Sequence, residues 1–281
     1  MKGKTVLVTG ATNGIGLEAA VVFAQAGAQV VMVGRDAGRT AAAVAQVKER
    51  SGSATVESLL CDFSSQESIR QLASNYRAKH QRLDVLVNNA GTVSASRTVT
   101  TDGLETTFAV NHLGYYLLTR LLLDLIQASA PARIVNVSSA GHYRGTMDFA
   151  DLGYERGYSI MGAYTRSKLG NVLFTRKLAR ALEGKGVTVN ALHPGGVATN
   201  IWSGAPGWSM PLLAVAKKLF MITPAQGAQT ITYLAMSPEV EGKTGLYFEK
   251  NRPKQAAKLA LDDALADKLW SESARLVKLD A

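Results

Sequence analysis

Short apolar runs alternate with helical patterns along most of the chain. The strand-like runs are KTVLVT (4–9), AQVVMVG (28–34), ATVESLLC (54–61), LDVLVNN (83–89), ARIVNVSS (132–139), GVTVNALHP (186–194) and TGLYF (244–248). Helical stretches such as GLEAAVVFAQAG and TAAAVAQVKERSG lie between them. Strands that are apolar on both faces and separated by helices are typical of a parallel sheet covered on both sides. The pattern predicts an α/β fold with a doubly wound parallel sheet of about seven strands.

Two stretches depart from this alternation. Residues 141–162 form a glycine-rich segment with aromatic residues, and residues 200–222 add tryptophan, leucine and methionine just after a strand end. Long insertions at the carboxyl ends of parallel strands are where such sheets bind ligands. We interpret 200–222 as a substrate lid, while a core helix and a membrane-surface helix stay open as alternatives.

The composition and the net charge limit the classes of protein to which this chain can belong. The chain has 281 residues, of which 47% are hydrophobic and 19% charged, so we expect residues 1–281 to form a single well-packed domain. The net charge of +9 is a possible signature of nucleic-acid binding. The basic residues are spread along the chain, however, and no basic run is interleaved with aromatics. We therefore favour solvated faces and a polyanionic small ligand, and expect no nucleic-acid partner.

Cysteine and histidine content gives no metal or disulfide signal. The single cysteine, Cys61, sits in the apolar run SLLCDF, which favours a buried structural thiol. The four histidines, His80, His112, His142 and His193, are far apart in sequence, so no metal site is predicted. The first ten residues enter a short strand, without an apolar segment of signal-peptide or membrane-span length. We expect a cytoplasmic protein with no membrane span.

A phosphate-binding loop is predicted at TGATNGIG (9–16), between the first strand and the first helix. Gly10 allows the tight turn, Gly14 lets the backbone approach a pyrophosphate, and Gly16 lets helix and sheet pack closely. The helix N-terminus then offers N–H groups and a positive dipole to the anion. Thr12, Asn13 and Ile15 belong to the same loop.

The end of the second strand predicts which nicotinamide cofactor is bound. An acidic residue there would bind a ribose 2′-hydroxyl, whereas an arginine accommodates a 2′-phosphate. The sequence VGRDAGR places Arg35 at this position and Arg39 four residues later, while Asp36 comes one place too late. NADP(H) is therefore preferred over NAD(H), with an Arg35–Asp36 pair or a solvated Arg35 as the alternative.

The segment YTRSK (164–168) places Tyr164 and Lys168 on one face of a predicted helix, since residues four apart lie one above the other. A tyrosine titrates near pH 10, and an adjacent cation favours its charged form. Taken alone this spacing recurs by chance, so the rest of the chain decides.

The order of several motifs identifies a family. NNAG (88–91), SS (138–139), YTRSK (164–168) and HPGG (193–196) follow the glycine loop, and together they resemble the short-chain dehydrogenase/reductase superfamily over residues 4–250. The resemblance implies a Rossmann fold. It also implies that Tyr164 is the general acid/base, that Ser139 holds the substrate oxygen, and that Lys168 binds the nicotinamide ribose and favours the tyrosinate. Asn111, in VNHLG, matches the fourth member, which supports a water-mediated proton path through Lys168.

The resemblance also implies further cofactor contacts. We choose Ser139 over Ser138 because the family pattern places it there, and strand alternation sends the two to opposite faces. The positions that would meet the adenine, the ribose floor and the nicotinamide end are Asp62, Phe63, Asn89, Ala90, Gly91, Pro194, Gly195 and Thr199.

The spacing within the site points to one branch of the superfamily. Tyr164 follows Ser139 by 25 residues, whereas most members have about a dozen, and this gap with NHLG and RSKLGNVLFTRKLAR resembles the retinol dehydrogenases and the WW-domain-containing oxidoreductase. That branch acts on lipophilic aldehydes, ketones and alcohols. The membrane-bound vertebrate retinol dehydrogenases begin with an apolar anchor that this sequence lacks, so an NADPH-dependent carbonyl reductase or alcohol dehydrogenase of broad specificity is the expected activity.

Other functions and assemblies stay open. A non-catalytic NADP-binding sensor or scaffold would need the glycine loop but not Ser139, Tyr164 and Lys168. The basic C-terminal segment, 250–278, would suit accessory binding to nucleic acid or a membrane surface. Members of the superfamily often pair through helices that here would span 103–128 and 160–183, which allows a homodimer or homotetramer.

Overall fold

The protein is described by a computed structural model, which describes residues 1–196 and 222–280. The predicted lid at 200–222 therefore lies outside the described residues, apart from Ile222. Eight strands of the described part form one sheet in the order β3-β2-β1-β4-β5-β6-β7-β8. Their bounds are β1 Thr5–Thr9, β2 Gln29–Gly34, β3 Val56–Leu60, β4 Val85–Asn88, β5 Ala132–Val137, β6 Val187–His193, β7 Tyr247–Glu249 and β8 Arg252–Lys254.

The sheet confirms the predicted doubly wound fold. Strands β1 to β7 are parallel, and β8 pairs antiparallel with β7 at the edge. Successive residues of β1 point to opposite faces, and both faces are buried: Val6 and Val8 lie in one apolar cluster and Leu7 in the other. Each face must therefore be covered by helices.

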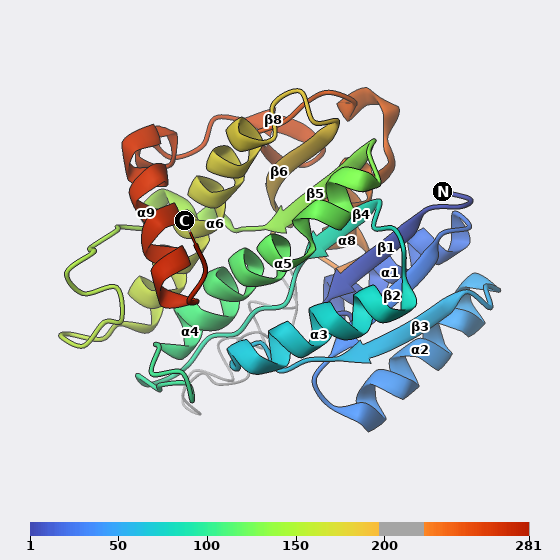
Figure 1. Cartoon of the computed structure of the whole chain (residues 1–281), viewed down its shortest axis with the longest axis horizontal. Coiled ribbons are helices and arrows are strands. Elements are labelled where there is room, and N and C mark those ends of the chain that lie inside the picture. Colours follow the sequence, from blue (N-terminus) through green and yellow to red (C-terminus); the bar gives the residue numbers. More distant parts are fainter. Residues whose placement is uncertain (197–221, 281) are drawn as a thin grey trace.

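Helices cover both faces, as Figure 1 shows. On one face pack α1 (Gly14–Gln25), α2 (Ala37–Ser51) and α8 (Pro224–Met236). On the other pack α3 (Gln66–Lys79), α5 (Gly114–Ala128) and α6 (Ile160–Ala181), and α9 (Asp263–Leu276) lies against α6. Shorter turns are α4 (Thr106–Phe108), the π-helix η1 (Ala109–Leu113), and the 3₁₀ turns η2 (Ala140–Arg144), η5 (Pro238–Val240) and η6 (Lys258–Leu261).

Local sequence explains where several helices begin. The Asp36 side chain accepts a hydrogen bond from the Arg39 backbone N–H at 2.8 Å and starts α2, which ends at Gly52 in the left-handed conformation with φ 69°. Helix α8 begins with Thr223 and Gln226, whose side chains bond each other's backbone N–H groups. These caps fix the residues at which the two helices begin.

None of the helices within the described residues combines the length and apolar composition needed to span a bilayer. The C-terminal segment 256–277 contributes Ala260, Leu269, Ala274 and Val277 to the buried core, with Trp270 packed against it. Most of its apolar residues are therefore used inside the protein, while Leu259 and Leu261 are exposed.

Candidate active site

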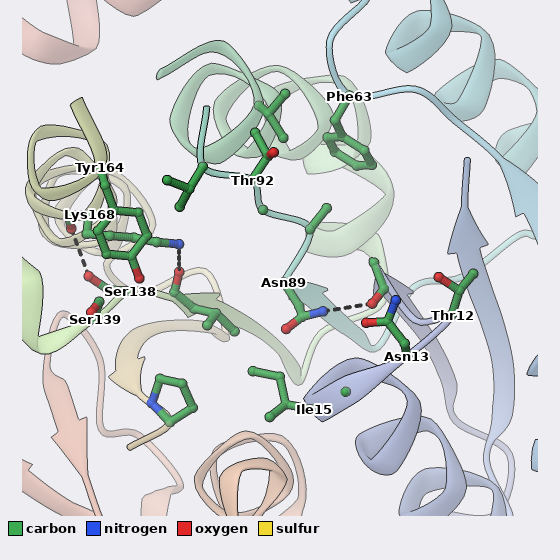
Figure 2. Close-up of a pocket in the computed structure, with 18 of the residues that line it drawn as sticks. Thr12, Asn13, Ile15, Phe63, Asn89, Thr92, Ser138, Ser139, Tyr164 and Lys168 are labelled. Carbon is green, nitrogen blue, oxygen red and sulfur yellow. Dashed lines mark hydrogen bonds between the residues drawn. The ribbon is translucent and has the colours of Figure 1, made fainter. Parts of the chain in front are cut away.

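A large cavity runs along the carboxyl ends of the parallel strands. It encloses about 770 Å³, which lies within the range of pockets that bind small molecules. It is centred where β1 and β4 lie side by side and the strand order reverses, the point at which open α/β sheets bind ligands. Figure 2 shows Tyr164, Lys168, Ser138 and Ser139 at one end of this cavity and Thr12 and Asn13 at the other.

Most of the predicted site residues line this one cavity. The structure places there Gly10, Thr12, Asn13, Gly14, Ile15, Arg35, Arg39, Asp62, Phe63, Asn89, Ala90, Gly91, Ser139, Tyr164, Lys168, Pro194 and Gly195. Gly16 and Asn111 lie behind the lining, and Thr199 lies outside the described residues.

The glycine loop is shaped to hold an anion. Gly10 and Gly14 have φ of 63° and 57°, a region that favours glycine. A Cβ on Gly16 would come within 2.5 Å of the Gly10 carbonyl oxygen, so only glycine allows this close packing. The Asn13 side chain makes no capping hydrogen bond at the start of α1 and no acidic residue stands in the first turn, which leaves the N–H groups of that turn available to a phosphate.

Asn89 holds the loop against the end of β4. Its side-chain amide donates to the carbonyl oxygens of Thr9 and Gly10 at 2.8 and 3.1 Å, and Figure 2 draws one of these two bonds. The Thr9 hydroxyl oxygen accepts from the backbone N–H groups of Asn89 and Ala90. Thr9 was not predicted as a site residue, although a polar residue at the end of an otherwise apolar strand was the available signal. The floor of the cavity is thus held by hydrogen bonds between two strand ends.

The two arginines at the end of β2 are exposed at the cavity, and the carboxylate between them is paired with one of them, Arg39. Asp36 caps α2 and lies 3.5 Å from Arg39 Nε, and the Arg39 backbone hydrogen bond holds the pKa of Asp36 below its ordinary value. The alternative Arg35–Asp36 pair is not found among the ion pairs of the described residues. A 2′-phosphate at this edge would meet Arg35 and the Arg39–Asp36 ion pair.

Ser139 and Tyr164 meet at the other end of the cavity. Ser139 follows β5, and its Oγ accepts from the Gly141 backbone N–H at 3.0 Å. The side chains of Ser139 and Tyr164 both line this end of the cavity, and Ser139 acts to lower the pKa of the Tyr164 hydroxyl. Ser138 also lines the cavity, but its hydroxyl donates to the Lys168 carbonyl oxygen at 2.8 Å, so the two serines have different partners.

Lys168 lies buried beside Tyr164 on α6. Its Nζ is 5.7 Å from the centre of the Tyr164 ring and donates to the Val137 carbonyl oxygen at 3.2 Å. Burial lowers the pKa of Lys168 to about 8. Burial raises the pKa of Tyr164 above its ordinary value, and Ser139 opposes this rise. Lys168 is not among the groups that shift the pKa of Tyr164, so the lowering that its proximity predicted is not seen in this arrangement.

Asn111 sits in the π-helix η1 and is fully buried. Its Oδ1 accepts from the Thr92 backbone N–H at 2.7 Å, and its Nδ2 donates to the Thr92 carbonyl oxygen and to Ser167 Oγ. The side chain therefore joins the NNAG loop to α6. Thr92 was not predicted as a site residue, because nothing in the motif itself marks the position after Gly91.

Two other expectations concern cysteine and metals. Cys61 is buried at the cavity wall, and burial raises the pKa of its thiol to about 12, which agrees with an inert thiol. Among residues 1–196 and 222–280, no group of three or more histidine, cysteine, aspartate or glutamate side chains is arranged to hold a metal ion.

Comparison with known proteins identifies the class of fold and chemistry. The short chain dehydrogenase family model matches residues 4–208. Retinol dehydrogenase 14 of Mus musculus is 43% identical over 291 residues, and retinol dehydrogenase 13 of Homo sapiens is 43% identical over 284; each match covers 99% of this chain and 86% of the relative.

Solved structures agree. An uncharacterized protein from Mycobacterium paratuberculosis has a TM-score of 0.80 at 30% identity, covering 99% of this chain and 95% of that one. A protein described as a short chain dehydrogenase from Shigella flexneri, in complex with NADP, has a TM-score of 0.69 at 25% identity, covering 90% of this chain and 98% of that one.

Proposed function

The chain belongs to the short chain dehydrogenase family and is an oxidoreductase related to the retinol dehydrogenases; on that basis we propose that it transfers a hydride between NADP(H) and a lipophilic aldehyde or ketone, or the corresponding alcohol. One observation carries the proposal. Ser139, Tyr164 and the buried Lys168 line the same cavity as the glycine loop.

The chain's own residues supply the proton step. When bound, the reduced nicotinamide supplies the hydride that forms the new C–H bond at the carbonyl carbon. The electron pair of the C=O π bond then takes the proton of the Tyr164 hydroxyl, and the charge passes to the tyrosine oxygen. Ser139 donates a hydrogen bond to the same substrate oxygen and stabilises its developing charge. Oxidation of an alcohol runs these steps in reverse.

Electrostatics in the site suit reduction at neutral pH. A tyrosine with its ordinary pKa of about 10 is protonated at neutral pH, and burial raises the pKa of Tyr164 further, so its hydroxyl holds the proton that reduction requires but is a weaker acid than an unperturbed tyrosine. Lys168, with a pKa of about 8, carries a proton over most of the neutral range and stabilises the tyrosinate after proton transfer. Both effects assign the acid role to Tyr164.

NADP(H) is our proposed cofactor because of the charges at the end of β2. Arg35 and Arg39 line the cavity there, whereas Asp36 is occupied as the cap of α2. Arginine binds phosphate through charge-assisted hydrogen bonds. An NADP-bound structural relative agrees with this choice.

The proposed substrate class follows from the cavity wall and the relatives. Val93, Val110 and Met161 line the cavity, and Met161 is one turn before Tyr164 on α6. An apolar wall binds substrates by buried area and discriminates weakly between homologues. The names of the similar curated proteins indicate retinol-like alcohols as the first compounds to test.

Oxidation of NADPH and NADH with a panel of aldehydes and ketones, retinal included, tests the function. We expect NADPH-dependent turnover that falls by about 10²- to 10⁴-fold in Tyr164→Phe, the range of general acid catalysis. Tyr233→Phe is the matched control, because Tyr233 lies on α8 outside the cavity and its hydroxyl bonds Glu239 in η5. Tight NADPH binding without turnover of any compound would instead favour the sensor or scaffold hypothesis.

A further inference from the structure

Two buried histidines stand beside the candidate catalytic residues. His112 directly follows Asn111, and His142 comes three residues after Ser139. Both are fully buried, and neither is among the residues that line the described cavity. Buried polar side chains need hydrogen-bond partners, so the partners indicate what each histidine does.

His142 joins Ser139 to the C-terminal segment, defined here as residues 255–280. The Ala257 backbone N–H donates to His142 Nε2 at 3.1 Å, so Nε2 must present its lone pair. Nδ1 therefore carries the proton and donates to the Ser139 carbonyl oxygen at 2.7 Å. The ring packs against Tyr143 and Tyr247, with centroid distances of 4.0 and 4.4 Å. A neutral imidazole thus fixes the backbone of Ser139.

His112 makes a second link to the same segment. Asn171 Nδ2 donates to the Val137 carbonyl oxygen at 3.3 Å, which turns its Oδ1 toward His112. His112 Nδ1 therefore carries the proton and donates to Asn171 Oδ1 at 3.3 Å, and Nε2 accepts from Ser273 Oγ at 3.0 Å. The Val137 carbonyl oxygen is also the acceptor for Lys168 Nζ. The chain of bonds runs from Ser273 to the oxygen that holds Lys168.

The C-terminal segment is itself fixed on α6, the helix that carries Tyr164 and Lys168. Lys177 and Arg176 pair with Asp267 and Asp263 at 2.9 and 3.1 Å. Trp270 stacks on Phe174 with a centroid distance of 6.0 Å and an interplanar angle of 22°. The segment can therefore act as a rigid support on which both histidines rest.

We propose that His112 and His142 are positioning residues, which couple the C-terminal segment to Lys168 and Ser139 and make that segment a part of the active site. The proposal rests on the proposed oxidoreductase function. Both histidines act as neutral bridges in one tautomer and neither exchanges a proton with substrate. Because displacement of a reacting group by about 1 Å can cost about 10²-fold in rate, loss of either bridge should lower kcat.

The first experiment compares kcat and KM in His142→Phe, His142→Asn and His112→Phe. We expect kcat to fall by about 10- to 100-fold in both Phe variants, with the Kd for NADPH within about twofold of wild type. The amide of His142→Asn can place a donor near the position of Nδ1, so it should recover part of the lost kcat. His80→Phe is the matched control: His80 is also buried and packs on Tyr76, but it lies at the opposite edge of the sheet and should keep wild-type kcat.

The second experiment does not depend on turnover. The amide of Ala257 bonds His142, and the amide of Gly141 bonds Ser139 Oγ, so hydrogen exchange at these two sites reports the bridge directly. Both should lose protection in His142→Phe and keep it in His80→Phe. Unchanged exchange at Gly141, or an unchanged kcat in both Phe variants, overturns the positioning role. Absence of turnover in the wild type refutes the proposed function. In that case the exchange data alone still test whether His142 holds Ser139 to the C-terminal segment.

Discussion

Acidification should destabilise the protein through His112. Burial lowers the pKa of this imidazole from the ordinary 6.5 to about 4. Above pH 6.5 the group is neutral in the folded and unfolded chains. Between pH 6.5 and 4 His112 is protonated in the unfolded chain but stays neutral in the folded chain, so the free energy of unfolding falls as the pH falls. Below pH 4 both states are protonated and the contribution levels off.

The magnitude follows from the difference between the two values. A pKa difference of about 2.5, at about 1.4 kcal/mol for each, gives a loss of about 3 kcal/mol from this one side chain. Since small proteins are stable by only about 5–15 kcal/mol, this loss is a large part of the total. Burial also lowers the pKa of His80, His142 and His193, so each adds to the effect in the same direction.

Urea unfolding at a series of pH values between 7 and 4 measures the effect, with wild type, His112→Asn and Ser273→Ala compared. Asparagine does not titrate, so unfolding of His112→Asn takes up as much as one proton fewer than unfolding of the wild type. The slope of its free energy of unfolding against pH should therefore be smaller by up to about 1.4 kcal/mol per pH unit. Ser273→Ala removes the hydrogen bond between Ser273 Oγ and His112 Nε2 but leaves the imidazole in place. This variant should be less stable than the wild type at every pH, with the same slope of free energy against pH. Parallel curves for wild type and His112→Asn would refute the reasoning.

Two further predictions concern the cofactor end of the cavity. Arg35→Asp should shift the preference from NADPH toward NADH by about 10- to 100-fold in kcat/KM, because it removes a charge-assisted contact worth about 1.5–3 kcal/mol. The control is Arg252→Asp on the exposed edge strand β8, which should leave the ratio of the two kcat/KM values unchanged. An unchanged ratio in both variants would contradict the role of Arg35. Gly16→Ala should weaken NADPH binding and lower the Tm, because the added Cβ would lie 2.5 Å from the Gly10 carbonyl oxygen. The control is Gly38→Ala in the first turn of α2, where the added Cβ meets nothing closer than 3.6 Å and should be tolerated. Titration calorimetry measures NADPH binding and thermal unfolding measures the Tm, and equal behaviour of the two variants would contradict the tight packing of the glycine loop.

The fold was predictable because the long strands and helices follow from local patterns. All seven predicted strands are present, since apolar runs of this length can be buried on both faces only in a covered parallel sheet. Strand β8, Arg252–Lys254, was missed because its three residues are exposed and include a proline, so no alternation marks it. The π-helix η1 within the predicted helix 103–128 was missed as well, because a change of hydrogen-bond register leaves no trace in hydrophobic spacing.

The candidate site was predictable where motif residues follow strand ends, because parallel strands bring their carboxyl ends to one edge. Asn89, Ser139 and the glycine loop meet there for this reason. The partners of the two histidines were not predictable. His142 and Ala257 are 115 residues apart, and His112 and Ser273 are 161 apart, so no local pattern could pair them.

Those separations also set an order of events during synthesis. At about 5–20 residues per second, a ribosome needs about 6–23 s to pass from His142 to Ala257. For that interval the nascent chain holds the glycine loop, Ser139 and then Tyr164, while Ala257 and Ser273, the C-terminal partners of the two imidazoles, have not yet been made. The cofactor end of the cavity can therefore assemble on the ribosome well before the proton-transfer end is fixed, and any catalytic competence of a growing chain must wait for α9.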